Sequence, residues 1–206
     1  MTLRLLLVRH AQTPWNVERR FQGWRDTPLS EAGLRQAAAV GRALAETPIH
    51  AIYASPLERA RATAEAIGAA RGLPVHLHEA FKEVGYGEWE GLTGDEVRAR
   101  APEAFQAWLA APQSIVPPGG EPLVEVQRRV LAGLADLRAR HDGQTVCVVA
   151  HAITGRILIL EVLGLPLERL WSVHLAATGI SELEFRDDWS ALHRMNTLVH
   201  LDGLPA

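Results

Sequence analysis

The chain has 206 residues, of which 48% are hydrophobic and 22% charged, with a formal net charge of -3. These values are ordinary for a globular protein with a sizeable core, and the length predicts a single domain over residues 1–206. The absence of a basic tract argues against a nucleic-acid partner, and no apolar run approaches the ~20 residues that span a bilayer.

The first predicted element is a strand over residues 3–8, an almost wholly apolar run that ends at Arg9 and His10. Such runs are typical of strands buried on both faces of a sheet. A long loop over residues 14–28 follows, and loops at the carboxyl end of a strand commonly carry function. A helix then runs from residue 31 to about residue 46, with Ser30 as its N-cap.

The next strand-like run covers residues 49–54, and a helix follows it to about residue 70. Arg59, near the start of that helix, shares a face with Thr63 and can reach back over the end of the strand. A short strand follows at residues 75–77. His76 and His78 lie there without a third ligand at suitable spacing, so we read them as surface histidines and predict no metal site.

Residues 81–91 are rich in glycine and aromatic residues and include three carboxylates, of which a loop of this shape can place one in a pocket. Two short helices are predicted at residues 93–100 and 102–110. The Pro/Gly-rich segment 112–122 is expected to lie over the mouth of that pocket. An amphipathic helix over residues 124–140 follows.

A second β-branched strand, residues 145–150, also ends at a histidine, His151, and a helix over residues 153–163 follows. The strand contains the single cysteine, Cys147, which is expected to be a buried apolar side chain. One cysteine excludes an internal disulfide framework, and the N-terminus lacks the pattern of a signal peptide. Both features predict a cytoplasmic protein.

Short strands at residues 170–175, 179–185 and 191–195 complete the chain, the last two as a hairpin. His174 and His200 belong to no motif and are expected to serve packing or surface roles. The alternation of buried strands and helices predicts an α/β protein. The expected architecture is a three-layer α/β/α sandwich with a mostly parallel central sheet.

Two buried strands that each deliver a histidine to one edge of a sheet are difficult to explain by packing. Open α/β sheets bind their ligands at the carboxyl ends of the strands. On Arg9 and His10 alone, a solvated strand end would be an equally good explanation. Together with Arg59 and His151, however, they would form a cationic cluster suited to a phosphoryl group, whose charge spreads over three oxygens.

Taken in order, these motifs resemble the histidine phosphatase (phosphoglycerate mutase-like) superfamily over about residues 3–160. The motifs are Leu7-Val8-Arg9-His10-Ala11-Gln12-Thr13, Asn16, Gly23, Leu29-Ser30-Glu31-Ala32-Gly33, the block from Ser55 to Ala64, Glu83 with Gly87-Glu88-Trp89-Glu90-Gly91, and His151. Ala11 and Ala152 stand where the family usually has glycine. Each adds one methyl group, so we expect an altered backbone approach rather than lost activity.

The resemblance implies that His10 is the nucleophile and that Glu83 is the proton donor and acceptor. Arg9, Arg59 and a protonated His151 would surround the phosphoryl oxygens. Glu88 and Glu90 would support the loop or lie in water. The implied substrate-binding residues are Thr13, Asn16, Gln22, Gly23 and Ala152. The family chemistry needs no metal and no other cofactor.

The phosphatase branch is favoured, because Lys82-Glu83-Val84-Gly85-Tyr86-Gly87 replaces the Glu-Arg-His-Tyr-Gly pattern typical of family mutases, which are usually longer there. The expected activity is hydrolysis of a small phosphorylated metabolite, such as α-ribazole phosphate or a phosphoglycerate, through a phosphohistidine. Mutase-type phosphoryl transfer, a non-catalytic phospho-ligand binding module and a metal-dependent hydrolase are the alternatives. The expected partner is thus a small phosphomonoester, without nucleic acid or membrane, and a homodimer is left open.

Overall fold

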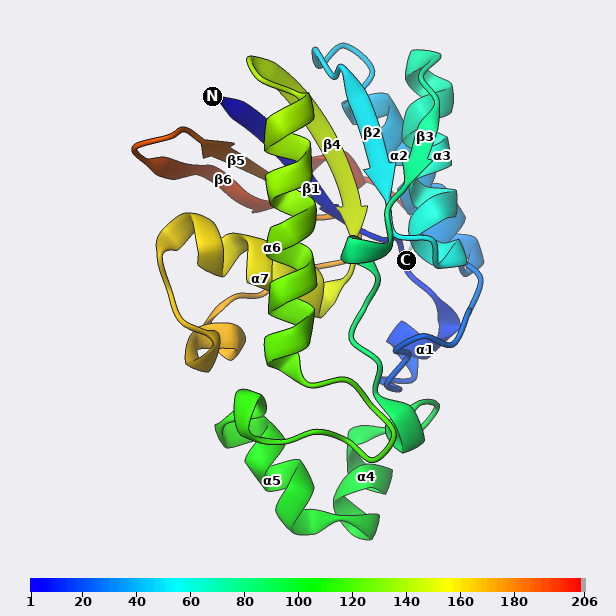
Figure 1. Ribbon diagram of the computed structural model, residues 1–206. Coiled ribbons are helices and arrows are strands. Elements are labelled where there is room, and N and C mark those ends of the chain that lie inside the picture. The colour runs from blue at the N-terminus through cyan, green and yellow to red at the C-terminus, as the bar shows by residue number, and fades with distance from the viewer. Residues whose placement is uncertain (205–206) are drawn as a thin grey trace.

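The computed structural model describes residues 1–204 and contains a six-stranded sheet with helices on both faces (Figure 1). The strand order is β3-β2-β4-β1-β5-β6. The strands are β1 (Leu3–Arg9), β2 (Ala51–Ala54), β3 (Val75–Leu77), β4 (Gln144–Ala150), β5 (Ile180–Phe185) and β6 (Ser190–Thr197). Strands β3, β2, β4 and β1 are parallel, whereas β5 is antiparallel to both β1 and β6. The predicted three-layer, mostly parallel α/β/α sandwich is confirmed.

The central strand β1 sends alternate side chains into the two helical layers. The layers consist of α2 (Glu31–Ala43) and α3 (Glu58–Arg71) on one face, and α6 (Leu123–Arg140) and α7 (Ala152–Leu163) on the other. Leu5 and Leu7 belong to the core cluster that contains α6 and α7. Leu6 and Val8 belong to the cluster that contains α2 and α3. Burial on both faces accounts for the unbroken apolar run in this part of the sequence.

The shorter helices lie mostly in the connections between these layers. They are α1 (Pro14–Val17), α4 (Gly94–Arg100) and α5 (Pro102–Ala110), with 3-10 helices at Glu79–Phe81, Gly87–Trp89, Pro112–Ser114, Leu167–Ser172 and Val199–Leu201. Helices α4 and α5 stand apart from the sheet, beyond the carboxyl ends of β2 and β4 (Figure 1). They therefore lie at the edge where the sequence predicts the site.

Two predictions of local structure are wrong. Residues 170–175 form no strand, because β1 already pairs with β4 and β5; instead the segment begins in a 3-10 helix and buries Leu170 and Leu175. The segment 14–28 is not wholly a loop. It opens with α1, because Thr13 caps that helix and the fixed backbone of Pro14 suits its first turn.

The segment 112–122 packs against the loop that carries Glu83. The Glu88 amide donates to the Pro118 carbonyl at 2.9 Å, and the Glu121 amide donates to the Gly85 carbonyl at 2.8 Å. Its residues do not line the small cavity described below, contrary to the expectation that they cover its mouth.

Cys147 has no exposed surface, and burial raises the pKa of its thiol to about 12. It is an apolar core residue, as predicted. Within residues 1–204, the helices are all too short or too polar to cross a membrane. The single domain over residues 1–206 and the cytoplasmic location stay predictions.

Candidate active site

Strands β1 and β4 bring the two motif histidines together. The strands are parallel neighbours in which Arg9 is paired with Ala150, so His10 and His151 follow at the same level of the sheet. Both side chains are buried, and their ring centroids lie 5.1 Å apart. The site therefore forms at the carboxyl edge of two central strands, where open α/β sheets bind ligands.

The hydrogen bond of the His10 ring determines which of its nitrogens can act as a nucleophile. Nδ1 lies 2.8 Å from the Ala11 carbonyl oxygen, which can only accept a hydrogen bond. Nδ1 therefore carries the proton, and Nε2 keeps its lone pair. Burial, with the charges of Arg59 and Arg9, lowers the pKa of His10 well below its usual value. The side chain is thus a neutral imidazole with one basic nitrogen.

A buried hydroxyl holds the backbone that follows this histidine. Thr63, on α3, accepts from the Ala11 amide at 3.0 Å and donates to the Arg59 carbonyl at 2.7 Å. Ala11 is fully buried, so the methyl group that replaces the family's usual glycine fits here. This contact links the turn after β1 to the helix that supplies Arg59.

Beside His10, Arg59 is buried and Arg9 is partly buried, and neutral backbone groups hold both side chains. Arg9 donates to the Leu175 carbonyl at 2.6 Å, and Arg59 donates to the carbonyls of Gly23 at 2.8 Å and Arg25 at 3.0 Å. The Nε of each arginine is buried and lacks a hydrogen-bond partner within residues 1–204. Burial lowers the pKa of both guanidinium groups, to about 10 for Arg59, and both remain cations at neutral pH.

His151 has no exposed surface and is fixed through one ring nitrogen. Its Nε2 lies 2.7 Å from the hydroxyl of Ser55, whereas its Nδ1 is buried without a partner in the described chain. Burial, followed by the charge of Arg59, lowers its pKa well below the usual value. The surrounding protein groups thus favour a neutral ring. The protonated form expected from the sequence needs the added negative charge of a bound dianion.

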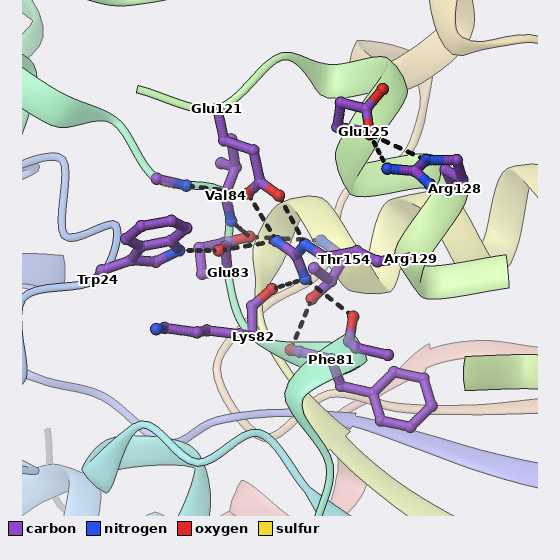
Figure 2. Close-up of polar contacts among 12 residues, drawn as sticks. Trp24, Phe81, Lys82, Glu83, Val84, Glu121, Glu125, Arg128, Arg129 and Thr154 are labelled. Carbon is purple, nitrogen blue, oxygen red and sulfur yellow. Dashed lines mark hydrogen bonds and ion pairs between the residues drawn. The ribbon is translucent and has the colours of Figure 1, made fainter. Parts of the chain in front are cut away.

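Glu83 lines the same cavity. Its buried carboxylate accepts from the amides of Val84 at 3.0 Å, Ile153 at 3.2 Å and Thr154 at 3.4 Å, the last two at the N-terminus of α7. Figure 2 shows how its backbone carbonyl is held at the same time by Trp24 and Arg129. The backbone and the carboxylate of Glu83 are therefore both fixed.

The two neighbouring carboxylates do not share this position. Glu88 is exposed. Glu90 accepts from the amides of Trp24 at 2.9 Å and Tyr86 at 3.1 Å, and so supports the loop. This division among the three carboxylates agrees with the expectation from the sequence.

Asn16 and Gln22 line the cavity, and the hydroxyl of Thr13 contacts the amide groups of both side chains. The Thr13 hydroxyl lies 3.1 Å from Asn16 Oδ1 and 3.0 Å from Gln22 Oε1. Because their oxygens face Thr13, the NH₂ groups of both amides remain available as donors. Thr13 itself is buried and does not line the cavity. It is therefore a support rather than the substrate contact that the sequence suggested.

Gly23 also lines the cavity and occupies a position where a side chain does not fit. Its φ is +54°, and a Cβ atom built there would lie 2.0 Å from Glu90 Oε1. Ala152, at the start of α7, forms another part of the wall. Both residues thus line the cavity, and their role in substrate binding stays a prediction.

The cavity between these groups measures about 110 Å³, and it adjoins a larger one of about 530 Å³. The two share Arg9, Asn16, Arg20 and Phe21. The sequence reasoning did not single out Arg20 or Phe21; their place in a long loop after β1 was the available signal. Tyr86 also lines the smaller cavity. No group of three or more His, Cys, Asp or Glu side chains within residues 1–204 gathers to hold a metal ion.

Comparison with known proteins identifies this arrangement. A model of the histidine phosphatase superfamily (branch 1) matches residues 5–198. The chain belongs to the histidine phosphatase superfamily.

Several histidine phosphatases resemble it over nearly their whole length. Phosphoserine phosphatase 1 of Hydrogenobacter thermophilus is 35% identical, covering 97% of this chain and 94% of that protein. The adenosylcobalamin/alpha-ribazole phosphatase of Salmonella typhimurium is 31% identical, covering 95% and 96%.

Solved structures of this superfamily show the same fold. YhfR of Bacillus stearothermophilus superposes with a TM-score of 0.92 at 35% identity, covering 97% of this chain and all of that one. A mycobacterial glucosyl-3-phosphoglycerate phosphatase superposes with a TM-score of 0.88 at 30% identity, covering 96% of this chain and all of that one. Three of these four relatives are named as phosphatases, which supports a phosphatase activity here.

Proposed function

We propose that this histidine phosphatase hydrolyses small phosphate monoesters through a phosphohistidine formed on His10. The observation that carries the proposal is the state of His10. It is a buried neutral imidazole whose Nδ1 bonds to the Ala11 carbonyl, which leaves Nε2 as the nucleophile beside the buried Arg59 and the partly buried Arg9.

In the first step, the lone pair on His10 Nε2 attacks phosphorus, and the bond from phosphorus to the ester oxygen breaks. Glu83, in its protonated form, gives its proton to the departing oxygen. Arg9 and Arg59 stabilise the charge on the other phosphoryl oxygens. His151 aids them once the bound dianion favours its protonated form.

In the second step, the Glu83 carboxylate takes a proton from a water molecule as that water attacks phosphorus. The bond between phosphorus and Nε2 breaks, inorganic phosphate leaves, and His10 regains its lone pair. Dividing a very slow hydrolysis into two displacements is the general advantage of a covalent intermediate. We propose that this cycle needs no metal, so activity should survive exhaustive treatment with a chelator.

The 530 Å³ cavity beside the phosphate position offers room for the organic part of the ester. Its lining combines Trp15 and Phe21 with charged side chains of both signs, among them Arg19 and Glu18, which suits a leaving group that is partly apolar and partly polar. The names of the relatives include phosphoserine, alpha-ribazole and glucosyl-3-phosphoglycerate phosphatases. We therefore propose a small phosphorylated metabolite, with α-ribazole phosphate, a phosphoglycerate and phosphoserine as the first compounds to assay.

Capture of the phosphohistidine tests the mechanism. Rapid mixing with p-nitrophenyl phosphate and acid-free quenching should give protein heavier by one phosphoryl group, mapped to His10 by mass spectrometry. The adduct should be acid-labile and stable to alkali, and Glu83→Gln should accumulate more of it. A matched His10→Ala sample should show neither adduct nor turnover.

The same experiment separates hydrolysis from the alternatives. Transfer of the phosphoryl group to added phosphoglycerate faster than to water would identify a mutase. Tight binding of phosphate esters without any turnover would identify a binding module. An adduct on another residue would overturn the assignment of His10.

A further inference from the structure

Arg129, on α6, binds the backbone of the segment that carries Glu83 (Figure 2). One terminal nitrogen, Nη1, donates to the carbonyls of Ala80 at 2.8 Å and Lys82 at 2.5 Å. The other, Nη2, donates to the Glu83 carbonyl at 3.0 Å. A single guanidinium therefore holds three carbonyl groups within four consecutive residues.

The Arg129 side chain is itself fixed by an ion pair with Glu121. Nε lies 2.8 Å from one carboxylate oxygen and Nη2 lies 2.9 Å from the other, the paired geometry that suits a planar guanidinium. The two side chains are only 23% and 16% exposed. The Glu121 amide also donates to the Gly85 carbonyl at 2.8 Å, so the pair joins α6 to both ends of the loop around Glu83.

Trp24 completes the arrangement from the loop after β1. Its indole Nε1 donates to the same Glu83 carbonyl at 2.7 Å. The Glu83 carboxylate meanwhile accepts amide hydrogens at the start of α7. The residue is thus held at its backbone by Arg129 and Trp24 and at its carboxylate by α7.

We propose that Arg129 is a positioning residue for the proton transfers of Glu83. The inference rests on the acid and base role proposed for Glu83 above. Proton transfer needs the carboxyl group within hydrogen-bond reach of the departing oxygen and then of the attacking water. Displacements of about 1 Å from a distant substitution can cost about 100-fold in rate. Arg129 does not line the 110 Å³ cavity that contains His10, and it acts through the backbone of Glu83.

The test compares Arg129→Gln with Arg128→Gln on two substrates. Arg128 is the matched control, because it is the adjacent residue of α6 and forms an exposed ion pair with Glu125 (Figure 2). An alkyl phosphate needs a proton on its leaving oxygen, whereas p-nitrophenyl phosphate expels a stabilised phenolate. Arg129→Gln should lower kcat/KM, which reports the first step, by about 10- to 100-fold on the alkyl ester and leave it nearly unchanged on the aryl ester. Arg128→Gln should leave both rates unchanged.

Three further measurements separate positioning from general damage. Arg129→Gln should accumulate phosphohistidine from the aryl ester, because hydrolysis of the adduct needs Glu83 as a base. When Glu83→Gln is already present, adding Arg129→Gln should lower the rate on the alkyl ester little further. Both substitutions remove the same function, proton transfer by Glu83. Arg129→Lys, which keeps the charge but loses the planar fork, should lie between wild type and Arg129→Gln.

The inference would be overturned by equal losses of kcat/KM on both esters, by additive losses in the double variant, or by wild-type rates in Arg129→Gln. If Arg129→Gln does not fold, Glu121→Gln tests the same point through a weakened ion pair. Glu121→Gln should again lower kcat/KM selectively on the alkyl ester. An equal loss of kcat/KM on both esters overturns the inference. Glu83→Gln measured alone keeps the two proposals distinct. If Glu83→Gln lowers kcat/KM equally on both esters, the role of Glu83 fails. If its loss is larger on the alkyl ester and that of Arg129→Gln is not, only the positioning role fails.

Discussion

Replacing Thr63 by valine tests how the turn after β1 holds His10. Thr63 is fully buried, and its hydroxyl accepts from the Ala11 amide at 3.0 Å while donating to the Arg59 carbonyl at 2.7 Å. Valine has nearly the same shape and lacks the hydroxyl. The substitution therefore removes two hydrogen bonds without opening a large cavity.

The expected cost follows from the group left without a partner. The Ala11 amide would be buried with no acceptor, which costs about 1–3 kcal/mol of unfolding free energy. The Ala11 carbonyl is the acceptor for His10 Nδ1, so a shift of the Ala11 backbone also disturbs the His10 ring. We expect kcat to fall about tenfold, which corresponds to about 1.4 kcal/mol in the activation free energy.

Urea unfolding followed by circular dichroism, together with kcat on p-nitrophenyl phosphate, would measure both effects. The slope of the unfolding free energy against urea should stay the same while the midpoint falls. Thr63→Ser, which keeps the hydroxyl, is the control and should retain most of the rate. A valine variant with the wild-type midpoint and rate would refute the argument that this hydroxyl holds the turn.

Two further predictions concern charge at the site. Burial and the nearby arginines lower the pKa values of His10 and His151 well below 6.5, whereas the unfolded chain binds protons on both rings below that pH. The folded state should therefore keep its full stability above pH 6.5 and lose it as the pH falls further. Thermal melts from pH 7.5 to pH 5 should show this loss, and His10→Gln should show less of it; an equal loss would contradict the assignment. Inorganic phosphate at about 100 times its Kd should raise the unfolding free energy by about 2.7 kcal/mol. Arg59→Gln should lose most of this gain at the same phosphate concentration, and an undiminished gain would place the anion elsewhere.

Much of the fold could be predicted because its signals are local. The run at residues 3–8 is apolar since both faces of β1 are covered, and Ser30 caps α2 by accepting from the Gly33 amide at 3.0 Å. The motif histidines stand directly after two such strands, so the sheet brings them together without any information on loops. Parallel pairing alone decides that geometry.

The contacts that support the site could not be predicted in this way. Arg129 lies in an amphipathic helix, and its partners at residues 80–83 are more than 45 positions away in the sequence. Thr13 belongs to a motif for which the sequence predicts phosphate contact, but tertiary packing turns its hydroxyl toward the amide oxygens of Asn16 and Gln22. A polar residue in a motif can bind the substrate or hold the residues that do, and only the packing distinguishes these roles.

The partners of the two arginines explain how the site keeps its positive charge. Within residues 1–204, neither Arg9 nor Arg59 forms an ion pair; both donate to backbone carbonyls. Carbonyl groups satisfy the geometry of a guanidinium without cancelling its charge, so the cations remain available to an incoming dianion. A carboxylate in the same place would neutralise these cations and weaken phosphate binding. Keeping His10 and His151 neutral limits the repulsion among these groups until the substrate supplies negative charge, and the same neutrality leaves His10 Nε2 free to attack.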